Sequence, residues 1–578
     1  MFMFSRLGSP ILGGTAGVLI ARFLLLSSGV IAVAQQPADS PQTAPDSTTL
    51  TLKAITQLTV EDVTVTDSKG QPVHGLTQSD FTVKEDGKLQ SIKNFQEYSA
   101  ENPQAQAAPL QLPPNVYSNR SATTNSAVNI LLFDNVGTGL ENVMFERLQS
   151  LKYLNTIPRG SQVAILNLTL GLHVMQGFTS DQNVLRAAID SLKPEVIPWA
   201  GMSSLIRSGG DPTNSAEFQN GIPGPSGIGL PPQLAGQGCR AMNNESEMTT
   251  AALDAIAAFV SGIKGRKNLI WFTPGIPWLT NYLRFSRIPC LRDYTSQLHR
   301  AYGLLTAAQV AIYPVRLGIG LPGDSMLDFA KATGGVAYSG SNYLDVALRE
   351  AITTGSNYYT LSYVPPFSKY DGKYHTIEVK VDHPGLHLDY REGYTSMDLA
   401  QPVKVDKKNP ATAPAPPVSE FHAAMMYGKP GATELLFDVS ALPSPASAVP
   451  GGTRGPAVIG SLNPKLQGKP LVRYDFTYVL PAGEITLAGD DPSGASKGSV
   501  EIVVAAFNAD GELLSSTQRT ANFPVKVDQV GQFMQQPSRF HIQLDLPPGK
   551  IFVRVGVLDV PSQKMGVLEV PETVTSQQ

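Results

Sequence analysis

Catalysis requires nucleophiles, bases or metal ligands at particular spacings, and the sequence contains none of the familiar arrangements. Its eight histidines are scattered, and no His-Glu-x-x-His, Cys-x-x-Cys, Gly-x-Ser-x-Gly or phosphate-loop pattern occurs. Asp490 and Asp491 precede a proline in a turn-rich stretch, which is typical of solvated loop charges. Four histidines near predicted strands fit packing or surface positions better than catalytic ones: His173, His375, His383 and His387. We therefore predict that the protein is not an enzyme, and a hydrolase is the catalytic alternative.

The only two cysteines, Cys239 and Cys290, offer a different kind of chemistry. Thiols that reach an oxidising compartment are usually paired. We expect a disulfide between them if the chain is exported, and the alternative is two unrelated buried thiols.

The first residues are typical of an export signal. Arg6 and Arg22 precede an apolar stretch at residues 23–33, and Ala32, Val33 and Ala34 supply the small residues that signal peptidase requires. We predict cleavage after Ala34 and a secreted or periplasmic location. A retained anchor is the alternative, but Arg22 divides the apolar run into pieces shorter than the roughly 20 residues of a spanning helix. No later segment is apolar enough to span a bilayer.

Composition and patterning indicate a multidomain globular protein. The formal charge of -4 is spread without long single-sign runs, so charge alone favours no nucleic-acid partner. Changes in pattern divide the chain as follows: signal peptide (1–34), linker (35–48), small β module (49–100), linker (101–126), α/β domain (127–397) with a Gly/Pro/Ser-rich surface insertion (201–238), Ala/Pro-rich linker (398–419) and C-terminal β-sandwich (420–578).

The central region alternates short apolar runs with longer helical patterns, which is typical of parallel βαβ units. Buried strands are predicted at residues 128–133, 162–168, 268–272 and 310–315, with helices at 145–154, 184–192 and 248–263 between them. Runs at residues 358–364, 376–381 and 386–390 are predicted as closing strands. The predicted fold class is α/β, a doubly wound, open and mostly parallel sheet flanked by the two β domains.

The segment from Leu131 to Thr138, Leu-Leu-Phe-Asp-Asn-Val-Gly-Thr, resembles the first strand and loop of bacterial secreted von Willebrand factor type A (VWFA)-related domain proteins. Further segments support the resemblance over about residues 49–395: 80–87, 177–181, 264–271, 311–315 and 358–363. The resemblance implies a VWA- or Rossmann-like sheet whose ligands bind at the C-terminal edge.

In this family a divalent cation occupies a metal-ion-dependent adhesion site (MIDAS) at that edge, with Mg²⁺ held by oxygen ligands. The resemblance places a degenerate version of the site at Asp134, Thr138, Ser203, Ser204 and Thr273. Val136 replaces one hydroxyl residue, and Thr273 stands where an Asp is expected. Mg²⁺ or another divalent cation is the implied cofactor, with Asp134 and Thr138 as its ligands.

Structural roles are the alternative for the same residues. Thr138 and Glu141 form a capping-box pattern, and Asp134 can accept hydrogen bonds from its own loop. We therefore expect an exported VWFA-like binding protein that recognises an extracytoplasmic protein or peptide at the C-terminal edge of the sheet. Metal-dependent adhesion through the partial MIDAS is the second hypothesis, and an exported hydrolase is the third.

Overall fold

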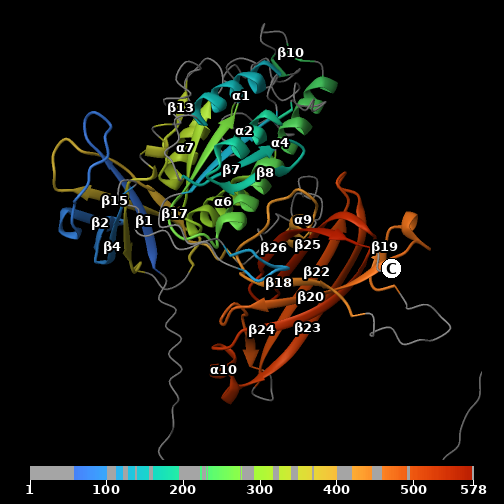
Figure 1. Ribbon diagram of the computed structural model, residues 1–578. Helices are drawn as coiled ribbons and strands as arrows, with labels where there is room; N and C mark the ends of the chain where they lie inside the picture. Colours follow the sequence, from blue (N-terminus) through green and yellow to red (C-terminus); the bar gives the residue numbers. More distant parts are fainter. Residues whose placement is uncertain are drawn as a thin grey trace, which may run out of the picture. The chain divides into compact units, whose positions relative to one another are not determined.

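The computed structural model describes residues 58–99, 112–120, 128–136, 140–154, 161–193, 222–223, 229–230, 232–273, 275, 292–316, 324–339, 349, 351–353, 355–366, 370–399, 419–445, 458–490 and 495–575. Within this part of the chain the strands form a small β-sandwich, a central α/β domain and a larger C-terminal β-sandwich (Figure 1).

The small sandwich is built from segments on both sides of the central domain. One sheet has the order β16 (His387–Asp389), β1 (Thr59–Thr66), β14 (Tyr358–Tyr363) and β4 (Ile92–Tyr98). The other has the order β17 (Gly393–Thr395), β15 (Tyr374–Val381), β2 (Phe81–Glu85) and β3 (Lys88–Gln90). All of these pairs are antiparallel.

This pairing corrects the expected grouping of the strands at residues 358–390, which the sequence assigned to the α/β domain. They complete the N-terminal module, so the α/β domain is inserted within the small sandwich. Burial alternates along β2 and β15, as it does when one face of a strand packs against a core. That core contains Val63, Phe81, Leu361 and Val379.

The central sheet has the order β13 (Tyr338–Ser339), β12 (Val310–Arg316), β11 (Lys267–Thr273), β6 (Val128–Asp134), β7 (Val163–Leu168) and β8 (Leu172–Thr179). Its pairs are parallel except for β7 with β8. Every residue of β6, β7 and β11 is buried, because helices cover this sheet on both faces. The α/β class predicted for this region is confirmed, whereas the sheets outside it are antiparallel.

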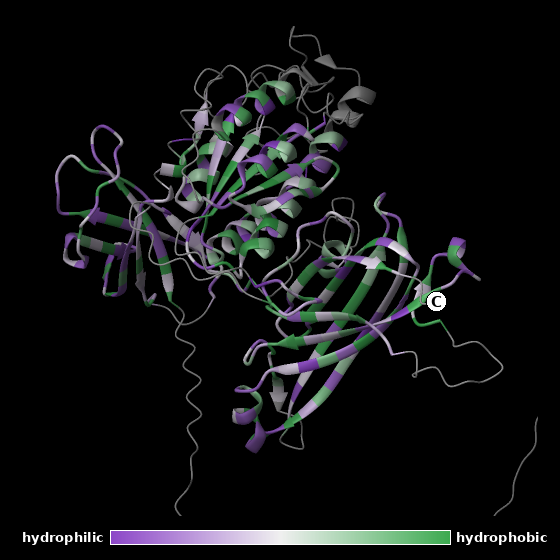
Figure 2. Cartoon of the chain, viewed as in Figure 1, coloured by the Kyte–Doolittle hydropathy of each residue, from purple (hydrophilic) through white to green (hydrophobic). Residues whose placement is uncertain are grey.

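Two apolar clusters divide the helices between the two faces of the central sheet. Trp271 and Ile312 face α4 (Pro232–Val260), α6 (Thr295–Ala307) and α7 (Asp324–Thr333). Phe133 and Ile270 face α1 (Leu140–Leu154) and α2 (Gln182–Asp190). Figure 2 shows the hydrophobic strands enclosed by these helices. Among the described residues, no helix is long and apolar enough to cross a membrane.

Helix α4 begins earlier than the sequence predicted. The expected insertion extended to residue 238, but the helix begins at Pro232, and two short strands pair before it: β9 (Ile222–Pro223) and β10 (Gly229–Leu230). The rest of the insertion lies outside the described residues.

The C-terminal sandwich packs two antiparallel sheets over one core. One sheet has the order β24 (Ser538–Leu546), β20 (Val472–Leu480), β18 (Asp438–Pro443) and β5 (Val116–Ser118). The other has the order β19 (Ser461–Leu462), β23 (Leu513–Lys526), β22 (Ala495–Phe507), β25 (Gly549–Asp559) and β26 (Lys564–Val574), with β21 (Ala488–Asp490) beside β22. Two short helices accompany it, α9 (Glu420–Ala424) and α10 (Val527–Phe533). Strand β5 corrects the prediction of a linker through residues 101–126, because it pairs with β18.

Candidate functional site

Asp134 is the last residue of β6 and lies at the C-terminal edge of the central sheet. Its Oδ2 accepts hydrogen bonds from the Thr273 hydroxyl at 3.0 Å and the Trp271 indole nitrogen at 3.2 Å, both on the adjacent strand β11. Its Oδ1 accepts the backbone N–H of Val136 at 3.1 Å, which is the bond within its own loop that the sequence suggested. The carboxylate is therefore fixed from three sides.

Burial changes the acidity of this carboxylate. Asp134 is 2% exposed, and burial raises its pKa to about 7, with a further increase from the negative charge of Glu245 on α4. The three hydrogen bonds act in the opposite direction because they stabilise the charged form. Asp134 thus lies next to a second buried carboxylate from a helix on one face of the sheet.

Glu146 contributes a third buried carboxylate from α1, on the other face. Its side chain is fully buried, and neither of its oxygens has a hydrogen-bond partner in the described part of the chain. Burial raises its pKa well above the ordinary value, and the charge of Asp134 adds to this effect. An unpaired buried carboxyl group is costly, so Glu146 calls for an explanation in terms of function.

The structure brings together two of the five residues predicted for the rim, Asp134 and Thr273. Thr138, Ser203 and Ser204 lie outside the described residues. Val136, where the family pattern has a hydroxyl residue, is buried in the apolar core and offers no oxygen ligand from its side chain. Cys239 lies in α4 but its side chain is not among those described, and Cys290 lies outside the described residues, so their pairing stays a prediction.

Sequence reasoning missed Glu146 and Glu245 for different reasons. The predicted helix began at residue 248, which left Glu245 in a loop, although Glu245, Ser246, Thr249 and Thr250 form a run of buried polar residues in the helix. Glu146 follows Phe145, which belongs to the apolar face predicted for the helix at residues 145–154, and Glu146 itself was not assigned to that face. The polar residues at helical spacing before the apolar helix could have indicated that the helix begins earlier and includes Glu245.

The residues at the end of β6 offer the kinds of donor atom that a divalent cation takes, although the carboxylate oxygens of Asp134, Glu146 and Glu245 do not gather within 4.8 Å of one another. Carboxylate and hydroxyl oxygens are the ligands that Mg²⁺ and Mn²⁺ prefer. Asp134, Glu245 and Thr273 supply such oxygens, and Glu146 adds a buried carboxylate without a hydrogen-bond partner. Asp134 does not line the main surface cavities of the described residues.

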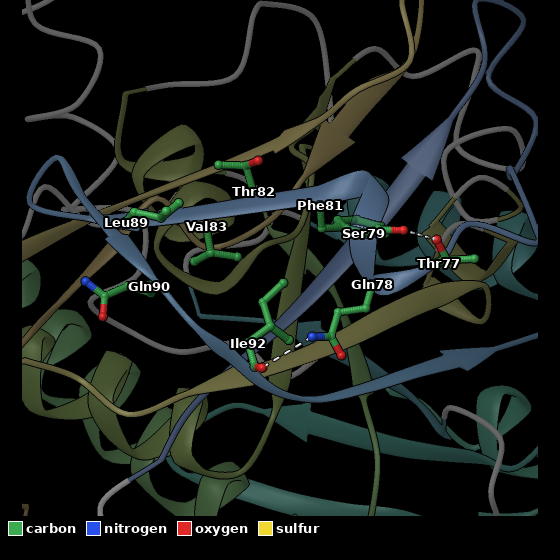
Figure 3. A pocket seen from close by; sticks show the side chains of 9 residues that line it. All are labelled: Thr77, Gln78, Ser79, Phe81, Thr82, Val83, Leu89, Gln90 and Ile92. Atoms are coloured by element: carbon green, nitrogen blue, oxygen red, sulfur yellow. Dashed lines mark hydrogen bonds between the residues drawn. The ribbon is translucent and has the colours of Figure 1, made fainter.

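The largest of these cavities, about 590 Å³, is a surface hollow on the small sandwich. Figure 3 shows that Phe81, Val83 and Ile92 contribute to its lining, and Gln78 donates a hydrogen bond across it to the carbonyl of Ile92. Its lining contains no acidic or basic side chain, so the hollow offers little for ion binding or acid–base chemistry.

Neither a protein-family model nor a curated protein sequence matches the chain. Several solved structures are similar to it. A von Willebrand factor type A protein from Catenulispora acidiphila is 11% identical, with a TM-score of 0.23, over 55% of this chain and 75% of that one. The vWF domain of the type V pili tip protein Mfa5 from Porphyromonas gingivalis is 10% identical, with a TM-score of 0.24, over 40% of this chain and 95% of that one.

Proximal thread matrix protein 1 from the mussel byssus, with a zinc-occupied MIDAS motif, is 12% identical, with a TM-score of 0.24, over 41% of this chain and 48% of that one. The chain therefore matches about half the length of the byssus protein. At these levels of similarity the comparisons assign no activity, ligand or partner to this chain.

Proposed function

We propose that the protein is an exported VWFA-like binding protein that recognises a protein or peptide at the C-terminal edge of its central sheet. The observation that carries the proposal is the fixed, buried Asp134 at the end of β6, held by Thr273 and Trp271 of the neighbouring strand. Open α/β sheets bind their ligands at this edge, where the loops between strands and helices vary most freely. The segment 201–230 precedes α4 in the chain, and we include it in the test of partner choice.

Metal-dependent adhesion is the second candidate function, and Glu146 favours it. Three buried carboxylates interact electrostatically around the end of β6: Asp134, Glu146 and Glu245. A divalent cation would compensate the accumulated negative charge, with Asp134 and Glu245 as the residues that would hold it. Such an ion would supply a positive charge that a ligand carboxylate can bind. Thr273 would act as a positioning residue by fixing the orientation of Asp134.

Calorimetry with Mg²⁺ and Mn²⁺ on the full chain tests the metal. We expect binding at millimolar or lower metal concentration, its loss in Asp134→Asn, and a decrease in affinity of roughly 10- to 100-fold in Thr273→Ala, as for other residues that orient a metal ligand. Asp190→Asn is the matched control, because Asp190 is a half-exposed carboxylate on α2 that pairs with Arg147. If the wild type binds neither ion, or if Asp134→Asn binds as well as the wild type, the metal hypothesis is wrong.

Partner recognition is tested with the purified full chain, cross-linked to proteins of the cell envelope in the presence of Mg²⁺ or of EDTA. A partner whose recovery decreases when residues 201–230 are replaced by a short Gly-Ser linker, and also in Asp134→Ala, supports recognition at this edge. Asp190→Ala should retain it. Recovery of the same partners by all variants would contradict the proposal. The hydrolase alternative is tested separately with panels of peptide and ester substrates, for which we expect no turnover.

A further inference from the structure

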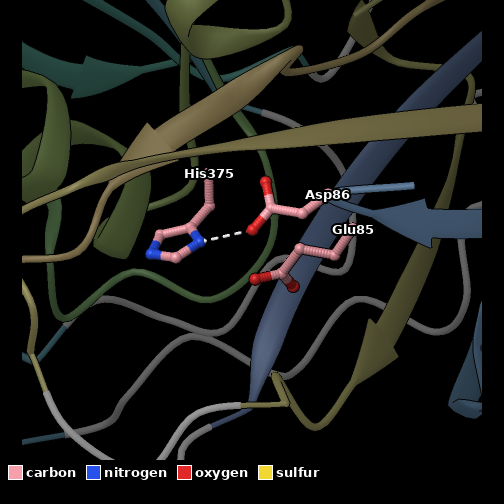
Figure 4. Close-up of side chains that lie close together, drawn as sticks. All are labelled: Glu85, Asp86 and His375. Carbon is pink, nitrogen blue, oxygen red and sulfur yellow. Dashed lines mark hydrogen bonds and ion pairs between the residues drawn. The ribbon is translucent and has the colours of Figure 1, made fainter. Parts of the chain in front are cut away.

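A second group of acceptor side chains meets in the small sandwich. Glu85 ends β2, Asp86 follows it in the turn to β3, and His375 lies on the paired strand β15. Each of the three offers one ligand atom, and these atoms lie within 4.8 Å of one another. Figure 4 shows both carboxylates on the same side of the imidazole ring.

The backbone places Asp86 in a fixed position. Asp86 and Gly87 form the two-residue turn between β2 and β3 with φ angles of 49° and 77°, which are typical of the type I′ hairpin turn that Asp-Gly favours. The Asp86 Oδ1 accepts the backbone N–H of Thr376 at 2.9 Å, so the side chain is tied to β15. Its Oδ2 lies 2.8 Å from Nδ1 of His375.

Glu85 provides the observation that points to a missing ligand. It is fully buried, and its Oε1 accepts a hydrogen bond from the Tyr394 hydroxyl at 3.1 Å. Its Oε2 makes no hydrogen bond of normal geometry in the described structure, although the Tyr363 hydroxyl, whose pKa is raised by burial, lies close enough for the Glu85 carboxylate to raise that pKa further. Half of a buried carboxylate is therefore unsatisfied at the edge of the group formed by Asp86 and His375.

Asp371 determines which nitrogen of His375 is available. Its Oδ1 lies 3.1 Å from Nε2 of the ring and accepts a hydrogen bond when Nε2 carries the proton. In the neutral tautomer this leaves the lone pair of Nδ1 facing Asp86 and Glu85. In that tautomer Nδ1, Asp86 and Glu85 face one another as acceptors, and either a proton on Nδ1 or a metal ion supplies the positive charge between them. A carboxylate that orients a histidine in this way is the usual outer neighbour of a metal-binding imidazole.

We propose that Glu85, Asp86 and Nδ1 of His375 form a binding site for a divalent transition metal of the zinc class, with Asp371 as the residue that orients the imidazole. Zinc accepts imidazole nitrogen and carboxylate oxygen together, at near-tetrahedral geometry. The buried Glu85 and His375 form the inner wall, while the Asp86 side chain is 43% exposed, which leaves a side open to water as the fourth ligand. The ion would fasten the β2–β3 turn to β15.

The proposal is tested by titrating zinc into the EDTA-treated full chain. The titration uses the Asp134→Asn variant as the parent, so that the rim site is removed. We expect one zinc per chain in a competition assay with a chromogenic chelator. His375→Gln should abolish binding, and Glu85→Gln, which keeps the shape of the side chain, should weaken it by roughly tenfold or more. His383→Gln is the matched control, because His383 is a half-exposed histidine of the same module that pairs with Asp80.

Thermal unfolding distinguishes loss of the site from loss of the fold. A ligand that binds only the folded state raises the melting temperature, so zinc should stabilise the parent and His383→Gln more than Glu85→Gln, whose circular dichroism spectrum should remain unchanged. The proposal is overturned if the parent binds no zinc at micromolar concentration, or if Glu85→Gln and His375→Gln bind zinc as tightly as the parent. A proton on Nδ1 would then be the only positive charge that this group holds.

Discussion

Replacement of Arg391 by methionine is expected to lower the free energy of unfolding by about 3–5 kcal/mol, the usual effect of removing one partner of a buried ion pair. The Arg391 guanidinium donates to Oε1 of Glu61 through Nε at 2.9 Å and also through Nη2, and the two side chains are 8% and 1% exposed. Even with Arg391 present, burial outweighs its attraction and raises the pKa of Glu61 to about 7. Without it, the charge of Glu61 has no compensation in the core.

Urea unfolding followed by circular dichroism at pH 8 measures the effect. Lys331→Met is the control, since the Lys331–Glu392 pair is exposed on both sides and should contribute little. The double variant Glu61→Met, Arg391→Met should recover most of the stability, because two apolar side chains replace the pair without leaving a charge behind. A loss below about 1 kcal/mol in Arg391→Met would mean that water reaches Glu61.

The second large effect is a gain of stability. In EDTA, Glu146→Met is expected to raise the free energy of unfolding by about 1–3 kcal/mol, because methionine removes a buried carboxyl group that has no hydrogen-bond partner in the described structure. Gln149→Met, a partly exposed position on the same helix, is the control and should change stability little. A destabilised Glu146→Met would show that the carboxyl group is satisfied in solution.

The pH dependence of the same variant has a defined sign. The folded-state pKa of Glu146 is raised, so the folded protein holds this proton more tightly than the unfolded chain does. The stability linked to this proton is fully present below the ordinary pKa of 4.5 and is lost as pH rises through the raised value. Melting temperatures measured from pH 4 upward should therefore show a smaller decline in Glu146→Met than in the wild type. If added metal reverses the order of stability, Glu146 takes part in the rim site.

Much of the central domain could be predicted from the sequence because buried parallel strands are apolar throughout. The runs that became β6, β7, β11 and β12 have this character, and they place Asp134 and Thr273 at one edge of the sheet. The small sandwich could not be assembled in the same way. Short runs of β-branched and aromatic residues identify β1 and β14 as strands, but they carry no information about which strand each one pairs with.

The candidate site was predicted in part for a related physical reason. Asp134 and Thr273 end strands, and strand ends are readable from apolar runs. Glu146 and Glu245 lie within helices on opposite faces of the sheet, where a buried acidic residue interrupts the apolar pattern instead of extending it. Such residues become visible only when the packing around them is known.

The insertion of the α/β domain within the small sandwich has a consequence for biosynthesis. Strand β4, which precedes the central domain, and strand β14, which follows it, meet where Tyr98 stacks on Tyr358 with ring centroids 4.7 Å apart. During synthesis from the N-terminus, β1, β2 and β4 leave the ribosome long before β14 and β15 are made. These early strands must keep their exposed edges unpaired until translation has passed the central domain, and a chaperone that binds extended segments would protect them during that interval.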